Sequence, residues 1–222
     1  MITGTHEQEN IWRAIAETDN HIFVNAGAGT GKTFTIVEGA NRLNFGVKSA
    51  FLCFNKSIQL ELEKRLPSDV EAKTFHSFGF AAIRNAGIKT RMNKFKLNNI
   101  IKDLLGRDYN VSPLKKLISL VKGCLIEGTD KHSILDLIEE YNINFHSDRE
   151  LKIALDSIPA ILTMCRTQTF HIDFDDMIWM PLVNNYPLST YDVMFVDEAQ
   201  DFNESQRELI KRCVNGGRCI IV

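Results

Sequence analysis

Residues 21–33 read His-Ile-Phe-Val-Asn-Ala-Gly-Ala-Gly-Thr-Gly-Lys-Thr. The apolar segment 21–25 is typical of a short buried strand, and the periodic segment 33–43 that opens at the end of the stretch predicts a helix. A strand, a glycine-rich loop and a helix in this order form the context that a phosphate-binding P-loop requires. The glycines let backbone N–H groups surround phosphate oxygens, and the amino end of the helix adds its positive dipole end.

The predicted phosphate site consists of this loop and the first residues of the helix. We expect Lys32 to reach the β- and γ-phosphates of a nucleotide and Thr33 to ligate Mg²⁺. The loop residues predicted to bind the nucleotide are Ala26, Gly27, Ala28, Gly29, Thr30, Gly31, Lys32 and Thr33. Ala26 stands where the strict pattern has its first glycine, and the alternative interpretation is an ordinary glycine-rich turn.

A second motif, Val-Asp-Glu-Ala-Gln-Asp at residues 196–201, ends the apolar segment 191–196. A buried strand that delivers two carboxylates at its carboxyl end suits a nucleotide-hydrolysing site. We expect Asp197 to hold Mg²⁺ and Glu198 to polarise water. Taken alone, the motif reads as an acidic helix start, but the P-loop upstream favours the catalytic interpretation.

Composition bounds the class of protein. The chain has 222 residues, 44% hydrophobic and 24% charged, which is typical of one large globular domain or of one domain with an insertion. A net charge of −2 excludes a generic binder of polyanions. No apolar run approaches the ~18 residues of a membrane span, so we expect no membrane partner.

The five cysteines follow no pairing pattern, which indicates reduced thiols, mostly in the core, in a cytosol-like compartment.

Charge is unevenly distributed along the chain. Residues 89–122 hold nine basic and two acidic side chains, a local charge of 9 − 2 = +7, so the remainder carries −2 − 7 = −9. This basic stretch suits either a surface that contacts a phosphate backbone or the solvated face of helices. Spacing alone leaves both interpretations open.

The periodicity predicts an α/β fold with a parallel sheet. Strands are expected at 21–25, 48–54, 70–74, 191–196 and 218–222, and helices at 7–18, 33–43, 57–66 and 75–85. Short buried strands that alternate with helices favour a parallel sheet covered on both faces. Because the last predicted strand ends the chain, we interpret the chain as a fragment of a longer protein.

The middle of the chain predicts an all-helical insertion. Between residues 92 and 165 apolar residues recur at helical spacing, and no strand-like run is present. Ser112 followed by Pro113 suggests a helix start with Ser112 as the N-cap. Pro159 is expected to kink or break its helix.

Six motifs in order resemble the N-terminal half of superfamily 1 DNA helicases of the UvrD/Rep/PcrA type, nearest their F-box-helicase-like and phage branches. They are THEQ at 5–8, AGAGTGKT at 26–33, FNKS at 54–57, TFHSF at 74–78, IDFDDM at 172–177 and VDEAQD at 196–201. The resemblance spans nearly the whole chain, with 92–165 matching only in helical character. It implies a RecA-like P-loop NTPase domain, 1A, formed by residues 1–88 and 170–222, and a helical subdomain, 1B, at 89–169. Domain 1A stops before the family's following motif.

The resemblance assigns roles to further residues of the nucleotide site. Gln8 is similar to a glutamine that reads adenine, with a surface helix cap as the alternative. Gln200 would lie near the γ-phosphate or couple it to DNA, and with Lys32, Asp197 and Glu198 it completes the predicted catalytic set. Phe34 departs from the family, because many relatives have an arginine there near the ribose.

The resemblance also implies contacts with single-stranded DNA at the carboxyl edge of the sheet. The predicted DNA-binding residues are Phe54, Asn55, Lys56, Thr74, His76 and Phe78. Exposed aromatic faces that stack on bases suit sequence-tolerant binding. A core position for either phenylalanine and a structural role for His76 remain alternatives. The aspartates 173, 175 and 176 are interpreted as helix-start caps rather than metal ligands.

The implied activity is ATP-dependent 3′–5′ movement on DNA, with ATP and Mg²⁺ as cofactors. The expected partners are single-stranded DNA or a single/double-strand junction, in the cytoplasm or a nucleus. A second RecA-like domain with arginine fingers is expected outside this chain, so we expect weak turnover by the chain alone. The alternatives are a non-helicase P-loop ATPase and a truncated module that binds ATP or DNA without processive activity.

Overall fold

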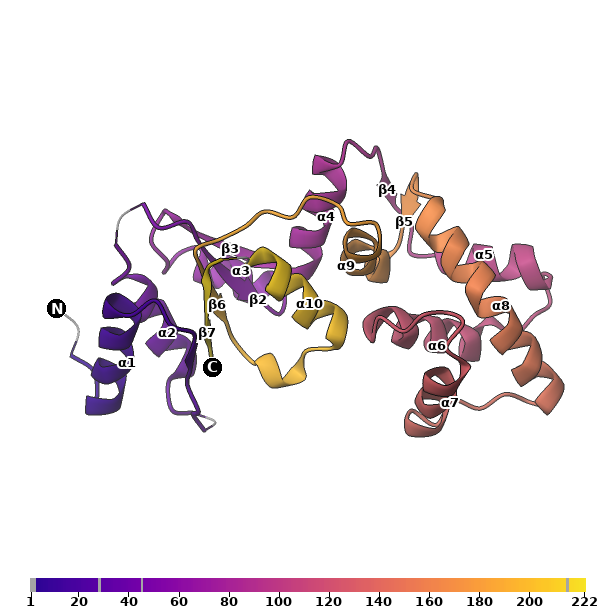
Figure 1. Ribbon diagram of the computed structural model, residues 1–222, viewed down its shortest axis with the longest axis horizontal. Helices are drawn as coiled ribbons and strands as arrows, with labels where there is room; N and C mark the ends of the chain where they lie inside the picture. Colours follow the sequence, from indigo (N-terminus) through magenta and orange to yellow (C-terminus); the bar gives the residue numbers. More distant parts are fainter. Residues whose placement is uncertain (1–2, 28, 45, 215) are drawn as a thin grey trace. The chain divides into compact units, whose positions relative to one another are not determined.

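The computed structural model describes residues 3–27, 29–44, 46–214 and 216–222, and the chain forms two compact units (Figure 1). The first unit consists of residues 1–78, 189–202 and 210–222. The second consists of residues 79–188 and 203–209. The chain leaves the first unit within α4 (Phe75–Asn85) and returns to it before β6 (Val193–Val196).

A five-stranded parallel sheet forms the centre of the first unit. In spatial order its strands are β1 (Ile22–Phe23), β7 (Arg218–Ile221), β6, β2 (Ser49–Cys53) and β3 (Val70–Thr74). Each neighbouring pair is parallel. Every residue of β2 and β6 is buried, because the sheet is covered on both faces, and their sequences are accordingly continuous apolar runs. The predicted α/β class with a parallel sheet is confirmed.

Helices of the first unit follow the strands in the predicted alternation. They are α1 (His6–Glu17), α2 (Lys32–Ala40), α3 (Lys56–Leu62), the start of α4, the end of α10 (Glu204–Cys213) and the 3₁₀ helix η1 (Ala199–Asp201). One face of the sheet buries Phe51, Phe195 and Ile220 in a cluster with Ile15 of α1 and Ile36 of α2. Since α2 and the P-loop are continuous, this packing fixes the loop to the sheet.

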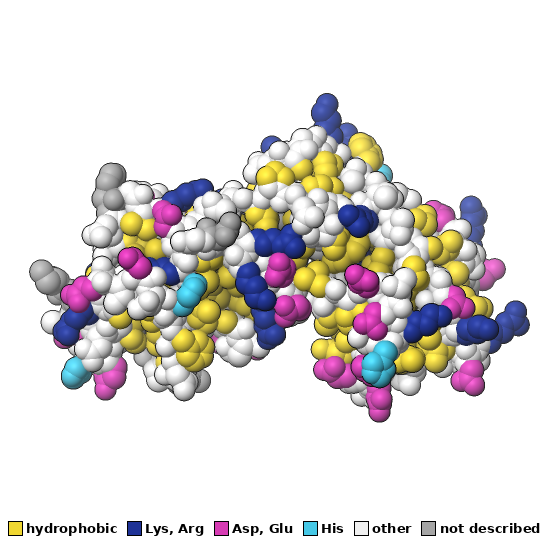
Figure 2. Space-filling model, in the orientation of Figure 1, with side chains coloured by type: hydrophobic (Ala, Val, Ile, Leu, Met, Phe, Trp, Pro, Cys, Tyr) yellow, Lys and Arg dark blue, Asp and Glu magenta, His cyan; other side chains and the backbone are white. Residues whose placement is uncertain are grey.

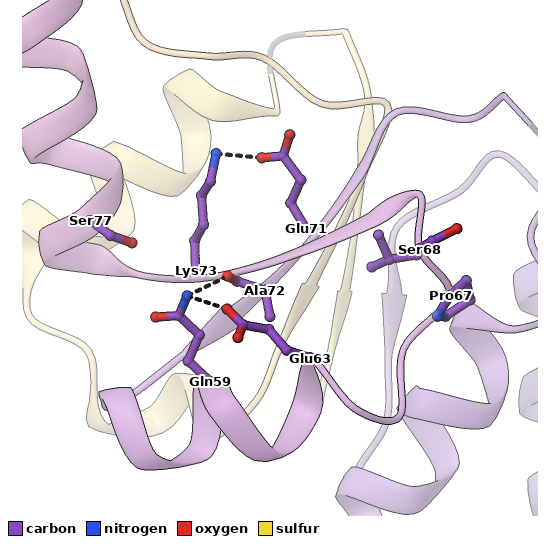
Figure 3. Close-up of a pocket in the computed structure, with 9 residues that line it drawn as sticks. Gln59, Glu63, Pro67, Ser68, Glu71, Ala72, Lys73 and Ser77 are labelled. Carbon is purple, nitrogen blue, oxygen red and sulfur yellow. Dashed lines mark hydrogen bonds and ion pairs between the residues drawn. The ribbon is translucent and has the colours of Figure 1, made fainter.

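The outer edge of β3 is closed by the chain itself. The side-chain amide of Gln59 donates to the Ala72 carbonyl at 2.9 Å, and the Ser77 hydroxyl accepts from the Thr74 amide at 2.9 Å. A pocket of about 430 Å³ lies beside this edge (Figure 3). The polar residues that line it include Gln59, Glu63, Glu71, Lys73 and Ser77. Gln59 pairs with Glu63, and Lys73 pairs with Glu71. These polar and charged side chains disfavour the pairing of another strand with the edge of β3.

The second unit is predominantly helical, as predicted for the middle of the chain. Its helices are the remainder of α4, α5 (Lys96–Leu105), α6 (Val111–Gly123), α7 (Lys131–Glu140), α8 (Asp148–Thr167), α9 (Phe174–Val183) and the start of α10. Leu114, Leu117 and Ile118 of α6 are completely buried with Ile158 and Ile161 of α8. The strands β4 (Arg91–Met92) and β5 (His171–Ile172), which pair in parallel, were not predicted, because two residues are too few to show a periodic pattern.

In the second unit, the predicted N-cap of α6 is wrong, and the helix break considered at Pro159 does not occur. Asn110, not Ser112, caps α6, and its side-chain oxygen accepts from the Ser112 amide at 3.3 Å. Pro113 does lie in the first turn. Helix α8 continues without interruption through Pro159, because the buried residues Ala154, Ile158 and Ile161 on both sides of the proline hold one face against the core.

The basic stretch 89–122 is not one continuous surface. Lys96 and Lys122 are 3% and 1% exposed, so two of its nine cations lie in the core of the second unit. On the face drawn in Figure 2, acidic and basic side chains alternate over the region of α6–α8. The stretch 89–122 is therefore not a uniform phosphate-binding surface.

The cysteines occupy the positions expected of small core residues. Cys53, Cys165, Cys213 and Cys219 are buried, Cys124 is half-buried, and all five thiols are free. Burial raises the pKa of the Cys53 thiol to about 12. Within the described ranges, none of the helices combines the length and the apolar character that crossing a bilayer demands.

Candidate nucleotide-binding site

The predicted nucleotide residues meet at the carboxyl edge of the parallel sheet. The P-loop follows β1, and Asp197 and Glu198 follow β6, with β7 between these two strands. Crevices outside the carboxyl ends of parallel strands are the usual ligand sites of open α/β sheets. The topology therefore brings together two motifs that lie more than 160 residues apart in the sequence.

The amino end of α2 is open toward solvent. Gly31 is the N-cap and has a φ of 80°, a left-handed conformation that glycine adopts without strain, and no side chain caps the helix there. Gly29 also has a positive φ, of 76°. Upstream in the loop, the Thr30 hydroxyl donates to the Gly27 carbonyl at 2.8 Å. Ala26 is half-buried, and Ala28 lies outside the described residues.

Lys32 and Glu198 form an ion pair across the site. The Lys32 Nζ atom lies 2.9 Å from Glu198 Oε1, and the Gln200 amide donates to Glu198 Oε2. The hydrogen bond that Lys32 donates to Glu198 raises the pKa of Lys32. In return, the hydrogen bonds from Gln200 and then from Lys32 hold the pKa of Glu198 below its usual value. Both groups are therefore charged near neutral pH.

Thr33 and Asp197 form the second cross-site contact. The Thr33 hydroxyl donates to Asp197 Oδ2 at 2.9 Å. The other carboxylate oxygen, Oδ1, is buried and has no hydrogen-bond partner among the described residues. A hydroxyl and a carboxylate with a spare buried oxygen are the hard oxygen ligands that Mg²⁺ prefers. These residues therefore fit a magnesium ion.

Glu198 has an unusual backbone conformation. Its φ of 56° and ψ of 41° lie in the left-handed region, which costs a non-glycine residue roughly 1–3 kcal/mol. The Glu198 amide donates to the Val222 carbonyl at 3.0 Å, and the Glu198 carbonyl accepts from the Asp201 amide at 3.1 Å. These two bonds hold the turn that directs Glu198 toward Lys32.

Gln8 lies beside the P-loop with both ends of its amide engaged. Its Oε1 accepts from the Thr5 amide at 3.0 Å, and Thr5 in turn caps α1, so the two residues form a capping box. Its Nε2 donates to the Thr35 hydroxyl at 3.1 Å. Gln8 is thus both a helix-cap residue and a neighbour of the phosphate loop. One N–H and one oxygen lone pair of the amide remain for a ligand.

Trp12 holds α1 against α2, a role that the sequence did not indicate. Its indole N–H donates to the Thr35 carbonyl at 2.8 Å, and the residue is 2% exposed. Phe34 packs edge-on against the indole at 6.3 Å, and the Arg42 guanidinium lies 3.9 Å from the ring centroid. Trp12 is four residues after Gln8, on the same helix face, and this spacing was the available signal. The departure at Phe34 is thereby explained as packing.

The three predicted DNA-binding residues at the end of β2 are exposed to solvent. Phe54 is 61% exposed, and Lys56 is also exposed. Asn55 caps α3, because its side-chain oxygen accepts from the Ile58 amide at 2.9 Å. An exposed aromatic ring beside a lysine suits stacking on an unpaired base with a phosphate contact.

The residues at the end of β3 are placed differently. Thr74 pairs in register with Cys53, so both motifs lie on one edge of the sheet. Its hydroxyl accepts from the Ser77 amide at 3.2 Å at the start of α4, and His76 is half-buried. Phe78 is 3% exposed and packs edge-on against Tyr191 at 5.5 Å, so its ring lies in the core. A stacking role for Phe78 does not fit this placement.

The aspartates before β6 begin a helix, as interpreted from the sequence. Asp173 and Asp176 form the capping box of α9, and Asp175 lies in its first turn. Asp176 has an additional role that the sequence did not indicate, because it is completely buried and pairs with both Lys96 and Lys122. The carboxylates of Asp173 and Asp176 are therefore occupied by lysines and backbone amides.

Comparison with known proteins identifies the family. The family model for the UvrD/REP helicase N-terminal domain matches residues 7–222. F-box DNA helicase 1 of Gallus gallus is similar to this chain, with 26% identity over 217 residues. The match covers 89% of this chain and 21% of the relative, so the chain corresponds to about a fifth of that protein's length. The chain belongs to the UvrD/REP helicase N-terminal domain family, a branch of the superfamily 1 DNA helicases.

Proposed function

We propose that this chain is the ATP-binding N-terminal portion of a DNA helicase or translocase that couples Mg-ATP hydrolysis to 3′–5′ movement on single-stranded DNA. The observation that supports it best is the pair of contacts Lys32–Glu198 and Thr33–Asp197 at one edge of a parallel sheet. A phosphate-binding lysine and a catalytic carboxylate that face each other are the parts that phosphoryl transfer requires.

The ion pair suggests how nucleotide binding prepares the site. A γ-phosphate competes with Glu198 for the Lys32 ammonium, so binding frees the Glu198 carboxylate. Glu198 then accepts a proton from the attacking water, while Gln200 keeps it oriented. Thr33 and the spare oxygen of Asp197 would hold Mg²⁺, which neutralises phosphate charge when it is bound. Gln8 would read the adenine edge with its remaining donor and acceptor.

We assign residues 1–88 and 170–222 to the RecA-like domain 1A and residues 89–169 to the helical subdomain 1B. These bounds differ from those of the two compact units, because residues 79–88, 170–188 and 203–209 pack with the helical unit. Phe54, Asn55, Lys56, Thr74 and His76 are the proposed contacts to single-stranded DNA or to a strand junction. The exposure of Phe54 supports this set. The proposed site of action is wherever chromosomal DNA lies, in the cytoplasm or in a nucleus.

Full activity is proposed to need a second RecA-like domain that supplies an arginine finger. Such a finger contributes roughly 10³–10⁵ in rate in related phosphoryl transfer reactions. The 222 residues alone should therefore bind Mg-ATP and turn it over slowly. Strong DNA-stimulated turnover by this chain alone would contradict this part of the proposal.

The test measures ATP binding and hydrolysis with and without oligothymidylate, for the wild type and Lys32→Ala. We expect the variant to lose ATP binding, because the ammonium is the phosphate contact, while Lys131→Ala, an exposed lysine in the second unit, behaves as wild type. ATP binding without any affinity for DNA would favour a non-helicase ATPase. DNA binding that neither ATP nor Lys32 affects would favour a non-enzymatic module.

A further inference from the structure

Three phenylalanines are exposed around the β4–β5 strand pair of the second unit. Phe95, Phe170 and Phe174 are 53%, 56% and 56% exposed, respectively. The same surface contains Met92, which is 42% exposed. Single exposed apolar residues are common on proteins, but three half-exposed aromatic rings on two short paired segments are not. We call residues 89–95 together with 170–174 the β4–β5 surface.

Cations are interleaved with these rings. Residues 89–95 contain Lys89, Arg91 and Lys94 and no acidic residue, and all three cations are exposed. The Arg91 guanidinium lies 5.7 Å from the Phe170 ring centroid, and the Lys94 ammonium lies 5.1 Å from that of Phe95. The aspartate of segment 170–174, Asp173, is buried against Lys122, so its charge is compensated inside the unit.

The strand pairing sets the spacing of the rings. The Arg91 amide donates to the Phe170 carbonyl and the Asn93 amide to the Ile172 carbonyl, both at 2.8 Å. Phe170 therefore lies at the amino end of the pair, whereas Phe95 and Phe174 follow its carboxyl end. Three residues lie between Phe170 and Phe174, and four steps of about 3.3 Å give a span of at most about 13 Å. This span accommodates a few nucleotides of a single strand.

The core of the second unit holds this surface in place through the buried residue between the exposed rings. Ile172 of β5 is completely buried in the core cluster that includes Leu97 and Trp179. His171 packs edge-on against Phe170 at 4.8 Å and supports that ring from its own strand. The exposed rings therefore stand on a fixed frame, which lowers the entropic cost of binding a ligand.

We propose that the β4–β5 surface is a binding site for single-stranded nucleic acid. Aromatic faces stack on unpaired bases, and the interleaved cations contact phosphates, a combination that tolerates any sequence. A duplex hides its base faces, so the exposed rings favour a single strand. The site consists of residues of the second unit, whereas the proposed contacts at residues 54–56 belong to the first. The inference rests on the proposed function only in that both involve single strands.

The test measures binding of a fluorescein-labelled oligothymidylate by anisotropy, using the whole chain. Phe170→Ala and Phe95→Ala should each weaken binding roughly five-fold or more, because each removes a stacking platform. Arg91→Ala should lower the slope of log K against log salt by about 0.7, the value for one phosphate contact on a single strand. Phe23→Ala, which removes a 75% exposed ring from β1, is the matched control and should leave binding unchanged.

Further arms separate the possible outcomes. An abasic oligonucleotide of equal length should bind wild type and Phe170→Ala equally, because it offers phosphates without bases. Photo-crosslinking of a thiothymidine oligonucleotide should label residues 89–95 or 170–174.

If Phe54→Ala weakens binding while Phe170→Ala, Phe95→Ala and Arg91→Ala do not, this inference is wrong and the proposed function stands. If the wild type binds no single strand, both are wrong. Unchanged thermal unfolding of each variant shows that a loss of binding is local.

Discussion

The Nζ atom of Lys122 lies 2.8 Å from Oδ1 of Asp176, and these side chains are 1% and 0% exposed. The Lys96 Nζ atom lies 2.6 Å from the other oxygen, Oδ2, and also donates to the Cys165 carbonyl at 2.7 Å. The Asp176 carboxylate of α9 thus binds lysines from both α5 and α6. Lys96 of α5 also binds α8, through the Cys165 carbonyl. Burial alone would lower the pKa of Lys122, but the charges of Asp176 and Asp173 outweigh it, and the net shift is upward.

Replacing Asp176 by alanine should destabilise the second unit strongly. The change leaves the buried Lys96 ammonium without a counter-charge and Lys122 with Asp173 alone, at 3.7 Å. Breaking a buried ion pair on one side costs about 3–5 kcal/mol. Urea unfolding followed by circular dichroism measures this loss. Lys131→Ala is the control, because its pair with Asp156 is more than half exposed and solvent screens it, so its loss should change stability little. A loss below about 1 kcal/mol for Asp176→Ala would show that the lysines relax to solvent.

A methyl group at Gly79 should also destabilise the second unit. A Cβ atom there would overlap the carbonyl oxygen of Met177, because α4 and α9 approach each other closely at this residue. Overpacking against backbone costs about 1–3 kcal/mol or more, so Gly79→Ala should lower the urea midpoint. Ala81→Gly in the same helix is the comparison for helix propensity. It makes the reverse substitution, which costs about 1 kcal/mol in propensity, without placing a Cβ atom against α9. Equal stability of Gly79→Ala and wild type would mean that α9 shifts freely.

The elements that could be predicted from the sequence are those specified by the residues of the element itself. Strand β3 and helix α4 begin and end at the predicted residues, 70–74 and 75–85, because the apolar periodicity changes sharply at Thr74. The caps of α6 and the continuity of α8 through Pro159 depend on tertiary packing and on a choice between neighbouring polar residues. Propensity is a weak prior in both cases, and packing overrides it.

The candidate site was predictable where a motif implies one spatial arrangement. Lys32 and Glu198 could be expected to meet, since parallel strands end at a common edge. The burial of Phe78 could not be predicted, because an aromatic residue after a strand suits the core and a stacking platform equally. The burial of Lys96 and Lys122 could not be predicted either, because a count of charges does not show which lysine has an aspartate from a distant helix as its partner.

The pKa of Glu198 should rise when Gln200 is replaced by alanine. The Gln200 hydrogen bond is the largest cause of the lowered pKa, and the Lys32 contact is the next. Because the folded-state pKa is lowered, this carboxylate stabilises the fold above its ordinary pKa of 4.5, and the contribution is lost as pH falls through the lower folded value.

A carboxyl-selective NMR titration measures this change. We expect Gln200→Ala to shift the Glu198 midpoint up toward the ordinary value and Lys32→Ala to shift it less. The control is Gln206→Ala, which removes a glutamine whose side chain bonds to the Asn203 amide instead. An unchanged Glu198 midpoint in Gln200→Ala would show that the amide does not hold this carboxylate in solution.

Trp12→Phe should weaken ATP binding, although Trp12 lies behind the site. Phenylalanine keeps most of the packing with Phe34 and Arg42 but loses the N–H that donates to the buried Thr35 carbonyl. Because the Thr35 carbonyl lies within α2 and keeps its helical hydrogen bond, the loss is that of one additional hydrogen bond, about 0.5–1.5 kcal/mol. Helix α1, which carries the proposed adenine contact Gln8, is then less firmly held against α2. Isothermal titration with ATP should show several-fold weaker affinity for this variant.

Trp179→Phe in the second unit is the matched control. It should lower stability comparably and leave ATP affinity unchanged, because Trp179 contacts Lys122 rather than the P-loop helix. Equal ATP affinity in both variants would mean that α1 positions Gln8 through the Thr5 capping box and the Thr35 hydroxyl alone.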